Sequence, residues 1–301
     1  MATTCSRRGI LALGGGAALL TALPGTALAA PARATDEVTR RLRELERQHS
    51  ARLGVYAYDT ATGRTVAHRA RERFPLCSVF KTLAAAAVLR DLDRDGRFLA
   101  RRIRYAEKDV TDSGYAPVTG KPENLAAGMT VAELCAATIA YSDNAAGNLL
   151  LRELGGPTAI TRFARSLGDR TTRLDRWEPG LNSAEPWRET DTTSSDAIGR
   201  TYARLVLGDA LVAKDRRRLT DWMLANTTGG EKLRAGLPSG WRVADKTGGG
   251  KYGTNHDVGV VWPPGRAPLL MAVLTTRYEP DASPDNPLVA KTATLLAQAL
   301  S

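Results

Sequence analysis

Strand-like segments occur only near the two ends of this 301-residue sequence, and this arrangement restricts the fold more than any other feature. RLGVYAYDTATGRTVAHR alternates apolar residues on both sides of a turn at Asp59 to Gly63, which predicts a β-hairpin. Near the C-terminus, WRVADKTG, NHDVGVVW and LLMAVLTT predict three more strands, with PPGRAP as a turn. Between these groups, from Ser78 to about Asn226, the pattern is mainly helical except for a loop over about residues 173–193.

Two helices are expected outside the strands. Val38, Leu42 and Leu45 recur at helical spacing in the segment 35–50, with Thr35 as the expected cap. PLVAKTATLLAQAL predicts a second helix that closes the chain.

The simplest packing of these elements is an α+β fold, in which one antiparallel sheet is flanked by the N- and C-terminal helices. An all-helical subdomain is then inserted between the two halves of the sheet. We expect residues 35–75 and 226–301 to form the α/β subdomain and residues 76–225 to form the all-α subdomain, which includes the loop 173–193.

The first residues predict an export signal. Arg7 and Arg8 precede an apolar stretch that closes on an A-x-A motif, the pattern of a signal peptide over residues 1–29, with cleavage between residues 29 and 34. The arginine pair is also typical of a twin-arginine signal. We therefore expect a secreted, extracellular protein with no stable membrane association after cleavage.

Charge and cysteine content exclude several classes of function. The 42 Lys and Arg residues exceed the 32 Asp and Glu residues, but the basic residues are scattered among acids, so we do not expect nucleic-acid binding. Cys77 and Cys135 are too few for a disulfide framework, and no Cys or His cluster has metal-ligand spacing. We expect no metal and no organic cofactor, and the isolated histidines argue against a Ser-His-Asp triad.

One serine and one lysine are candidates for covalent catalysis. Ser78 precedes Lys81 by three residues at the start of a helical run, so both side chains should point to the same side. A desolvated lysine can take the proton of a serine hydroxyl and make it a nucleophile. Alone, the pair is weak support, because the polar start of an ordinary helix gives the same spacing.

Two further motifs follow in order. Ser142-Asp143-Asn144 precedes an apolar helical run, and Lys246-Thr247-Gly248 lies on a predicted strand. Taken separately, these are a helix cap and a strand end. S-x-x-K, S-D-N and K-T-G in this order are the signature of class A β-lactamases and penicillin-binding proteins.

The sequence closely resembles the class A serine β-lactamases of the penicillin-binding, or SxxK acyl transferase, superfamily. Their long omega loop carries an E-P-x-L-N run, present here as EPGLN at residues 178–182. The resemblance covers nearly the whole mature chain. It implies that a monomer hydrolyses the β-lactam amide bond of penicillins and some cephalosporins through a serine acyl-enzyme (EC 3.5.2.6), which confers β-lactam resistance.

The resemblance also implies catalytic roles. Ser78 attacks the carbonyl, and either Lys81 or Glu178 acting on a water removes its proton. Ser142 passes a proton to the leaving nitrogen. Glu178 with Asn182 holds and deprotonates the water that releases the acyl group.

Further residues are expected to bind substrate. The backbone N–H groups of Ser78 and Gly249 would hold the oxyanion. Asn144 would bind the side-chain amide of the substrate, Tyr115 would form an aromatic wall, and the K-T-G residues Lys246, Thr247 and Gly248 would meet the carboxylate.

Other matches concern the omega loop and the substrate range. Arg176 and Asp191 match the ion pair that ties the ends of the omega loop. Lys232 stands where many relatives carry a carboxylate-binding arginine, and lysine lacks the bidentate fork. Gly249 replaces a Ser, Thr or Ala, so we expect penicillins to be preferred over oxyimino-cephalosporins.

Two other functions share part of this pattern. A D-alanyl-D-alanine carboxypeptidase or other penicillin-binding protein has the first three motifs but lacks the omega-loop glutamate. A non-catalytic penicillin sensor would be acylated and stay acylated.

Overall fold

The computed structural model describes residues 29–301, so the predicted signal peptide lies outside the described residues except for Ala29. The centre of the fold is a five-stranded antiparallel sheet in the order β2-β1-β9-β8-β7. Its strands are β1 (Arg52–Asp59), β2 (Thr65–His68), β7 (Arg242–Gly249), β8 (Asn255–Trp262) and β9 (Leu269–Thr276). The predicted α+β fold with a sheet built from both ends of the chain is confirmed.

Strand β1 brings segments from the two ends of the chain together in one sheet. It pairs with β2 through the predicted hairpin and along its full length with β9, with Val55 opposite Val273. On the far side of the sheet β7 pairs with β8, which places Lys246 opposite Val258.

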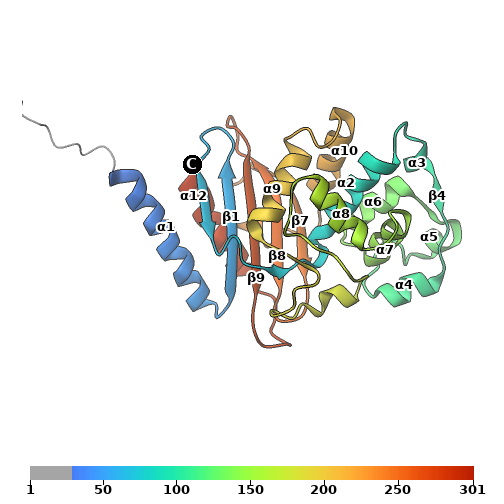
Figure 1. Ribbon diagram of the computed structural model, residues 1–301, viewed down its shortest axis with the longest axis horizontal. Helices are drawn as coiled ribbons and strands as arrows, with labels where there is room; N and C mark the ends of the chain where they lie inside the picture. Colours follow the sequence, from blue (N-terminus) through green and yellow to red (C-terminus); the bar gives the residue numbers. More distant parts are fainter. Residues whose placement is uncertain (1–28) are drawn as a thin grey trace, which may run out of the picture.

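The two faces of the sheet are covered by different helices. Because side chains alternate along a strand, Leu269, Met271 and Val273 of β9 pack with α1 (Ala29–Gln48) and α12 (Asn286–Leu300), and the residues between them face the other way. That opposite face packs against α9 (Ser195–Val206), which crosses the sheet in Figure 1.

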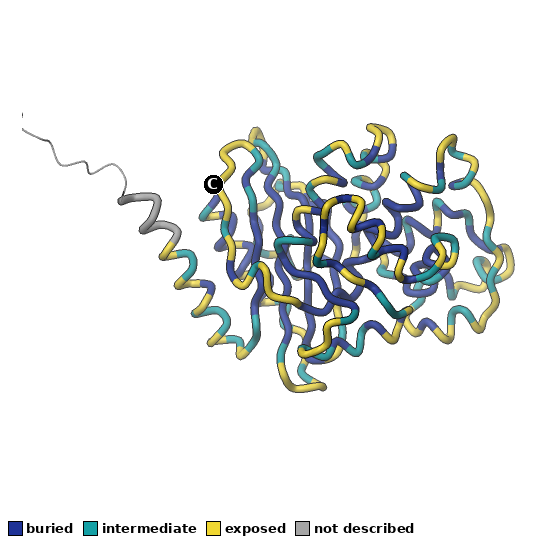
Figure 2. Tube along the Cα trace, in the orientation of Figure 1, coloured by how far each residue is buried: buried dark blue, intermediate teal, exposed yellow. Residues whose placement is uncertain are grey.

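The remaining helices, apart from the short α11 (Leu233–Gly236), form a body beside β7, on the right of Figure 1. Its central helix is α2 (Phe80–Ala87), in which every residue is buried (Figure 2). Four of its residues are alanines, whose small side chains let neighbouring helices approach closely. Around it lie α3 (Arg97–Ala100), α4 (Glu107–Ser113), α5 (Pro122–Ala127), α6 (Val131–Ala140), α7 (Asn144–Glu153), α8 (Thr158–Ser166) and α10 (Ala213–Leu224).

Several short elements connect these layers. A single 3₁₀ turn, η1 (Cys77–Val79), leads into α2, and a π-helical turn, η2 (Val88–Leu92), follows it. Short strand pairs that the sequence did not predict are β3 (Phe74–Pro75) with β6 (Thr192–Thr193), and β4 (Arg102–Ile103) with β5 (Met129–Thr130). The loop 173–193 contains one 3₁₀ helix, η3 (Gly180–Ser183), and α11 (Leu233–Gly236) precedes β7.

The expected start of the first helix was wrong. Helix α1 begins at Ala29, so Thr35 lies inside the helix and is not its cap. Pro31 lies in the first helical turn, where the missing N–H leaves no hydrogen bond unmade. Among residues 29–301, no helix is long and apolar enough to span a bilayer.

Candidate active site

Ser78 lies in η1, between β7 and the helical body. Its side chain is 6% exposed. The turn is held from two sides, because Tyr202 Oη donates to Val79 O over 2.8 Å and His256 Nε2 lies 2.8 Å from Pro75 O. These contacts hold the backbone on both sides of Ser78.

Lys81 follows one turn later and is completely buried. Its Nζ donates to Asn144 Oδ1 over 2.6 Å and to Ser142 O over 2.8 Å, and it lies 3.0 Å from Glu178 Oε1. Burial lowers the pKa of Lys81, and the charge of Glu178 opposes that shift. No hydrogen bond joins Lys81 Nζ to Ser78 Oγ among residues 29–301.

Glu178 is the group that contacts Ser78 directly. Ser78 Oγ donates to Glu178 Oε1 over 3.2 Å, while Asn182 Nδ2 donates to the other oxygen, Oε2, over 2.5 Å. The carboxylate therefore has one oxygen on the serine and lysine side and the other on the omega-loop side. The peptide bond between Glu178 and Pro179 is cis.

Asn148 holds the main chain of Glu178 and was missed by the sequence analysis. Its Oδ1 accepts from Glu178 N over 3.0 Å, and its Nδ2 donates to Glu178 O over 2.9 Å. Asn148 comes four residues after Asn144 in α7, so the helical spacing could have indicated that both amides share one face.

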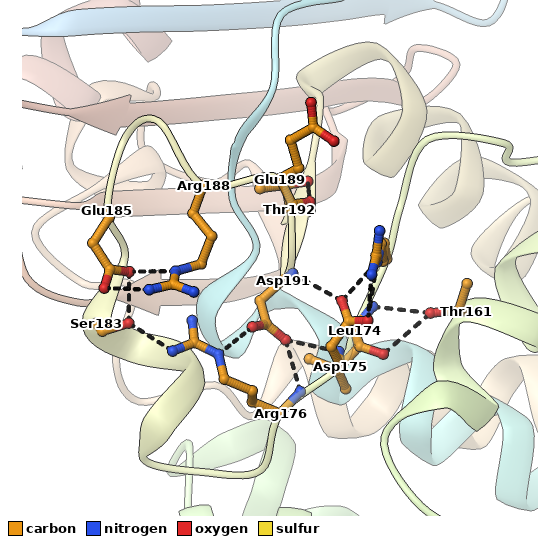
Figure 3. A network of polar contacts seen from close by, with 11 residues as sticks. Thr161, Leu174, Asp175, Arg176, Ser183, Glu185, Arg188, Glu189, Asp191 and Thr192 are labelled. Atoms are coloured by element: carbon orange, nitrogen blue, oxygen red, sulfur yellow. Dashed lines mark hydrogen bonds and ion pairs between the residues drawn. The ribbon is translucent and has the colours of Figure 1, made fainter.

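The ends of the omega loop are closed by Arg176 and Asp191 (Figure 3). Asp191 Oδ2 lies 2.5 Å from Arg176 Nε, and Asp191 Oδ1 accepts from the backbone N–H groups of Asp175 and Arg176 over 2.8 and 2.9 Å. Leu76 N donates to Asp191 O over 2.7 Å, which ties the closed loop to the segment before Ser78.

The three residues of the S-D-N motif make different contacts. Ser142 has a positive φ of 58° and places Oγ 3.1 Å from Lys246 Nζ and 3.5 Å from Lys81 Nζ. Asp143 is buried and caps α7 by accepting from Ala146 N over 2.8 Å. Only Ser142 and Asn144 therefore contact the other site residues.

Asn144 and Tyr115 lie next to each other. Asn144 N donates to Tyr115 O over 2.8 Å, and the Asn144 Nδ2 group donates to Ser113 O over 2.9 Å. Tyr115 is 57% exposed, so it does not pack in the core.

The K-T-G motif lies on β7 beside this group. Lys246 Nζ donates to Thr247 O over 2.9 Å as well as to Ser142 Oγ, and burial lowers its pKa well below the usual range, helped by the charges of Lys81 and Lys232. Thr247 Oγ1 lies 2.5 Å from Thr228 Oγ1. A Cβ on Gly248 would lie 3.3 Å from Val79, whereas one on Gly249 would meet only Thr254 O at 3.7 Å.

Lys232 lies near the K-T-G motif. Arg234, the other basic residue close by in sequence, does not take its place there. Lys232 Nζ donates weakly to His256 O over 3.4 Å, and burial lowers its pKa against the charges of Asp257 and Asp245. Arg234 instead pairs with the buried Asp245 at 2.6 Å.

Cys77 and Cys135 are free and buried. Burial raises the pKa of both thiols. Within the part of the chain that the structure describes, no group of three or more His, Cys, Asp or Glu side chains is arranged to hold a metal ion.

The sheet with flanking helices and the buried serine, lysine and glutamate group beside β7 together define a protein with the β-lactamase fold. Comparison with known families agrees: the model Beta-lactamase2, described as a beta-lactamase enzyme family, matches residues 37–300. The chain belongs to this family.

Named relatives cover nearly all of the chain. It is 69% identical over 297 residues to a beta-lactamase of Streptomyces lavendulae, with 98% of this chain and 97% of the relative covered. It is 62% identical over 305 residues to a beta-lactamase of Streptomyces albus G, with 98% and 97% covered.

Solved structures agree with these relatives. The beta-lactamase from Streptomyces albus G superposes with a TM-score of 0.87 at 66% identity, covering 88% of this chain and all of that chain. A beta-lactamase from Desulfarculus baarsii gives a TM-score of 0.86 at 45% identity, covering 89% of this chain and 98% of the other.

Proposed function

We propose that this protein is a class A serine β-lactamase (EC 3.5.2.6), which hydrolyses the amide bond of penicillins and some cephalosporins and so confers resistance to them. The observation that carries the proposal is the position of Glu178, whose Oε1 lies 3.2 Å from Ser78 Oγ and 3.0 Å from Lys81 Nζ. The beta-lactamase names of the relatives with 60 to 70% identity support the substrate class.

In the first half-reaction, Ser78 Oγ forms a bond to the β-lactam carbonyl carbon. Glu178 takes the serine proton, since its carboxylate already accepts the hydroxyl hydrogen bond while Lys81 is bound to other groups. The oxyanion is held by the backbone N–H groups of Ser78 and Gly249. When the carbon–nitrogen bond breaks, Ser142 gives its proton to the nitrogen and regains one from Lys81. Lys81 in turn takes the proton that Glu178 removed from Ser78, so Glu178 is a carboxylate again before the second half-reaction.

In the second half-reaction, water attacks the acyl-enzyme. Asn182 Oδ1 is buried and accepts no hydrogen bond among residues 29–301, so it can accept one from a water that Glu178 deprotonates. The acid product leaves and the proton returns to Ser78. This step separates an enzyme that turns over from a protein that is only acylated.

The substrate carboxylate is met by Lys246, Thr247 and Lys232 at the Gly248 end of β7. Asn144 and the exposed ring of Tyr115 receive the substrate side chain. Gly249 offers no hydroxyl to an oxyimino group, which favours penicillins.

We also propose the cellular setting. The protein acts outside the cell as a monomer after removal of the signal over residues 1–29, and the A-x-A motif and the arginine pair support this. Its site lies between an α/β subdomain (35–75 and 226–301) and an all-α subdomain (76–225).

The test is time-resolved hydrolysis of benzylpenicillin by the mature protein, followed with intact-mass spectra. Wild type should turn over continuously, Ser78→Ala should form no adduct, and Glu178→Ala should retain a stable acyl adduct. A single stoichiometric burst and a stable adduct on wild type would instead identify a penicillin-binding protein or sensor.

A further inference from the structure

An exposed tryptophan in the omega loop contacts a tyrosine in the turn between β7 and β8. The Trp187 and Tyr252 ring centroids are 5.4 Å apart with an angle of 81° between the planes, an edge-to-face pair. Trp187 is 69% exposed, whereas Tyr252 is 8% exposed. Most of the Trp187 side chain therefore stays exposed to solvent while its ring contacts the turn between β7 and β8.

Two backbone hydrogen bonds to residues outside the omega loop hold Tyr252. Its φ is +59°, a region that a bulky residue rarely occupies unless the surroundings impose it. Its N–H donates to Pro280 O over 2.9 Å, and its carbonyl accepts from Arg277 N over 2.7 Å. The Tyr252 ring is therefore held in a fixed position where Trp187 of the omega loop contacts it.

The same turn binds the main chain of Asn182. Lys251 N donates to Asn182 O over 3.0 Å. A Cβ on the neighbouring Gly250 would lie 2.8 Å from Asn182 O and 3.0 Å from Cys77 Sγ, so the turn and the loop are in close contact here. Asn182 is the residue whose amide holds Glu178 Oε2.

Beyond Asn182, the polar contacts of the loop are mostly internal. Ser183 binds Arg176 and Glu185, and Glu185 binds Arg188 (Figure 3). These bonds shape the loop but do not attach it to the sheet. The contact of Trp187 with Tyr252 does so, five residues beyond Asn182.

We propose that Trp187 and Tyr252 form an aromatic latch that positions Asn182, and through it the water-activating oxygen of Glu178, for release of the acyl group. The proposal rests on the function given above. Both are positioning residues, because they act through Asn182 and touch neither substrate nor Ser78. Since Asn182 contacts Oε2 and not the oxygen that faces Ser78, the latch governs hydrolysis of the acyl-enzyme more than its formation.

The test compares Trp187→Ala with Trp187→Phe, which keeps a ring, and with Tyr278→Ala, which removes an equally exposed aromatic side chain outside the omega loop. For benzylpenicillin, Trp187→Ala should lower kcat and KM together by about 2- to 10-fold, the range of an edge-to-face pair, with kcat/KM unchanged. The acyl-enzyme should then accumulate in intact-mass spectra at steady state. Trp187→Phe should recover most of kcat, and Tyr278→Ala should match wild type.

A purely structural role gives a different result. Loss of folded enzyme would lower kcat and kcat/KM equally at constant KM, and that outcome, or unchanged kinetics, would overturn the latch.

A second readout does not depend on turnover. Amide hydrogen exchange at Lys251 should be faster in Trp187→Ala than in wild type and Tyr278→Ala, and equal rates would also overturn the latch. If wild type is acylated once and never released, the proposed function fails, and the exchange rates alone then decide whether the latch holds Asn182.

Discussion

Lys81 Nζ lies 3.0 Å from Glu178 Oε1, and neither side chain is exposed to solvent. A buried ion pair of this kind is costly to break from one side, because the remaining charge keeps its desolvation penalty without a partner. The pair to which we assign the chemistry is therefore also a determinant of stability.

Lys81→Met should destabilise the protein. Removing the ammonium leaves the Glu178 carboxylate buried and unpaired, so the free energy of unfolding should fall by about 3 to 5 kcal/mol at pH 7. Urea unfolding of wild type and Lys81→Met at pH 7 measures this, and a loss below about 1 kcal/mol would contradict it.

Asn148→Ala should weaken the attachment of Glu178 more than Asn148→Asp. The alanine variant loses both bonds to the Glu178 main chain, whereas aspartate can still accept from its N–H group. We expect stability losses of about 2 kcal/mol for alanine and about 1 kcal/mol for aspartate. Denaturant midpoints give the order, and accumulation of acyl-enzyme with benzylpenicillin should follow it. The reverse order would show that the donor to Glu178 O matters more.

Asp191→Asn should loosen the closure of the omega loop. Asparagine keeps the size of the side chain and tolerates the φ of +55° at this position, so the change removes mainly the charge that binds Arg176. We expect a loss of about 2 kcal/mol in the free energy of unfolding. Asp112→Asn breaks an exposed pair with Lys108 and should cost less than about 0.5 kcal/mol. Equal effects of the two substitutions would argue against a special role for the closure.

His256 should make the protein less stable in mild acid. Burial lowers its pKa to about 4, and its ring is satisfied only when neutral, since Nδ1 accepts from Thr275 N while Nε2 donates to Pro75 O. Because the folded pKa is below the unfolded value of about 6.5, this contribution is complete above pH 6.5 and is lost as the pH falls toward 4. Between pH 7 and pH 5 the loss should be about 2 kcal/mol.

The control for this effect is His256→Asn, which removes the titrating group. The variant will be less stable at pH 7, but its unfolding free energy should change less between pH 7 and pH 5 than that of wild type. An identical pH dependence in the two proteins would assign the acid sensitivity to other groups.

Patterns local in sequence predicted much of this molecule. Alternation around Asp59 to Gly63 located the first hairpin, and the order of strands and helices was sufficient for the sheet and its inserted helices. The motif residues Ser78, Lys81, Ser142 and Lys246 were found from spacing and order, and the structure brings their side chains around one point. The start of α1 was missed because a helix can continue through a proline in its first turn.

Contacts between distant segments were not predictable in this way. His256 appeared isolated in the sequence, yet it binds Pro75 across the fold. Asn148 and the pairing of Trp187 with Tyr252 depend on how the omega loop lies on α7 and on the turn after β7, which no local pattern specifies.

The pairing of β1 with β9 also sets a condition on biosynthesis. Arg52 leaves the ribosome long before Thr276, its partner in the sheet, so until the last part of the chain has been made β1 has an open edge and the sheet is incomplete. Such an edge invites pairing with other chains. A route that exports folded protein must therefore wait for the finished polypeptide, and a route that exports unfolded protein leaves the closing of the sheet to the far side of the membrane.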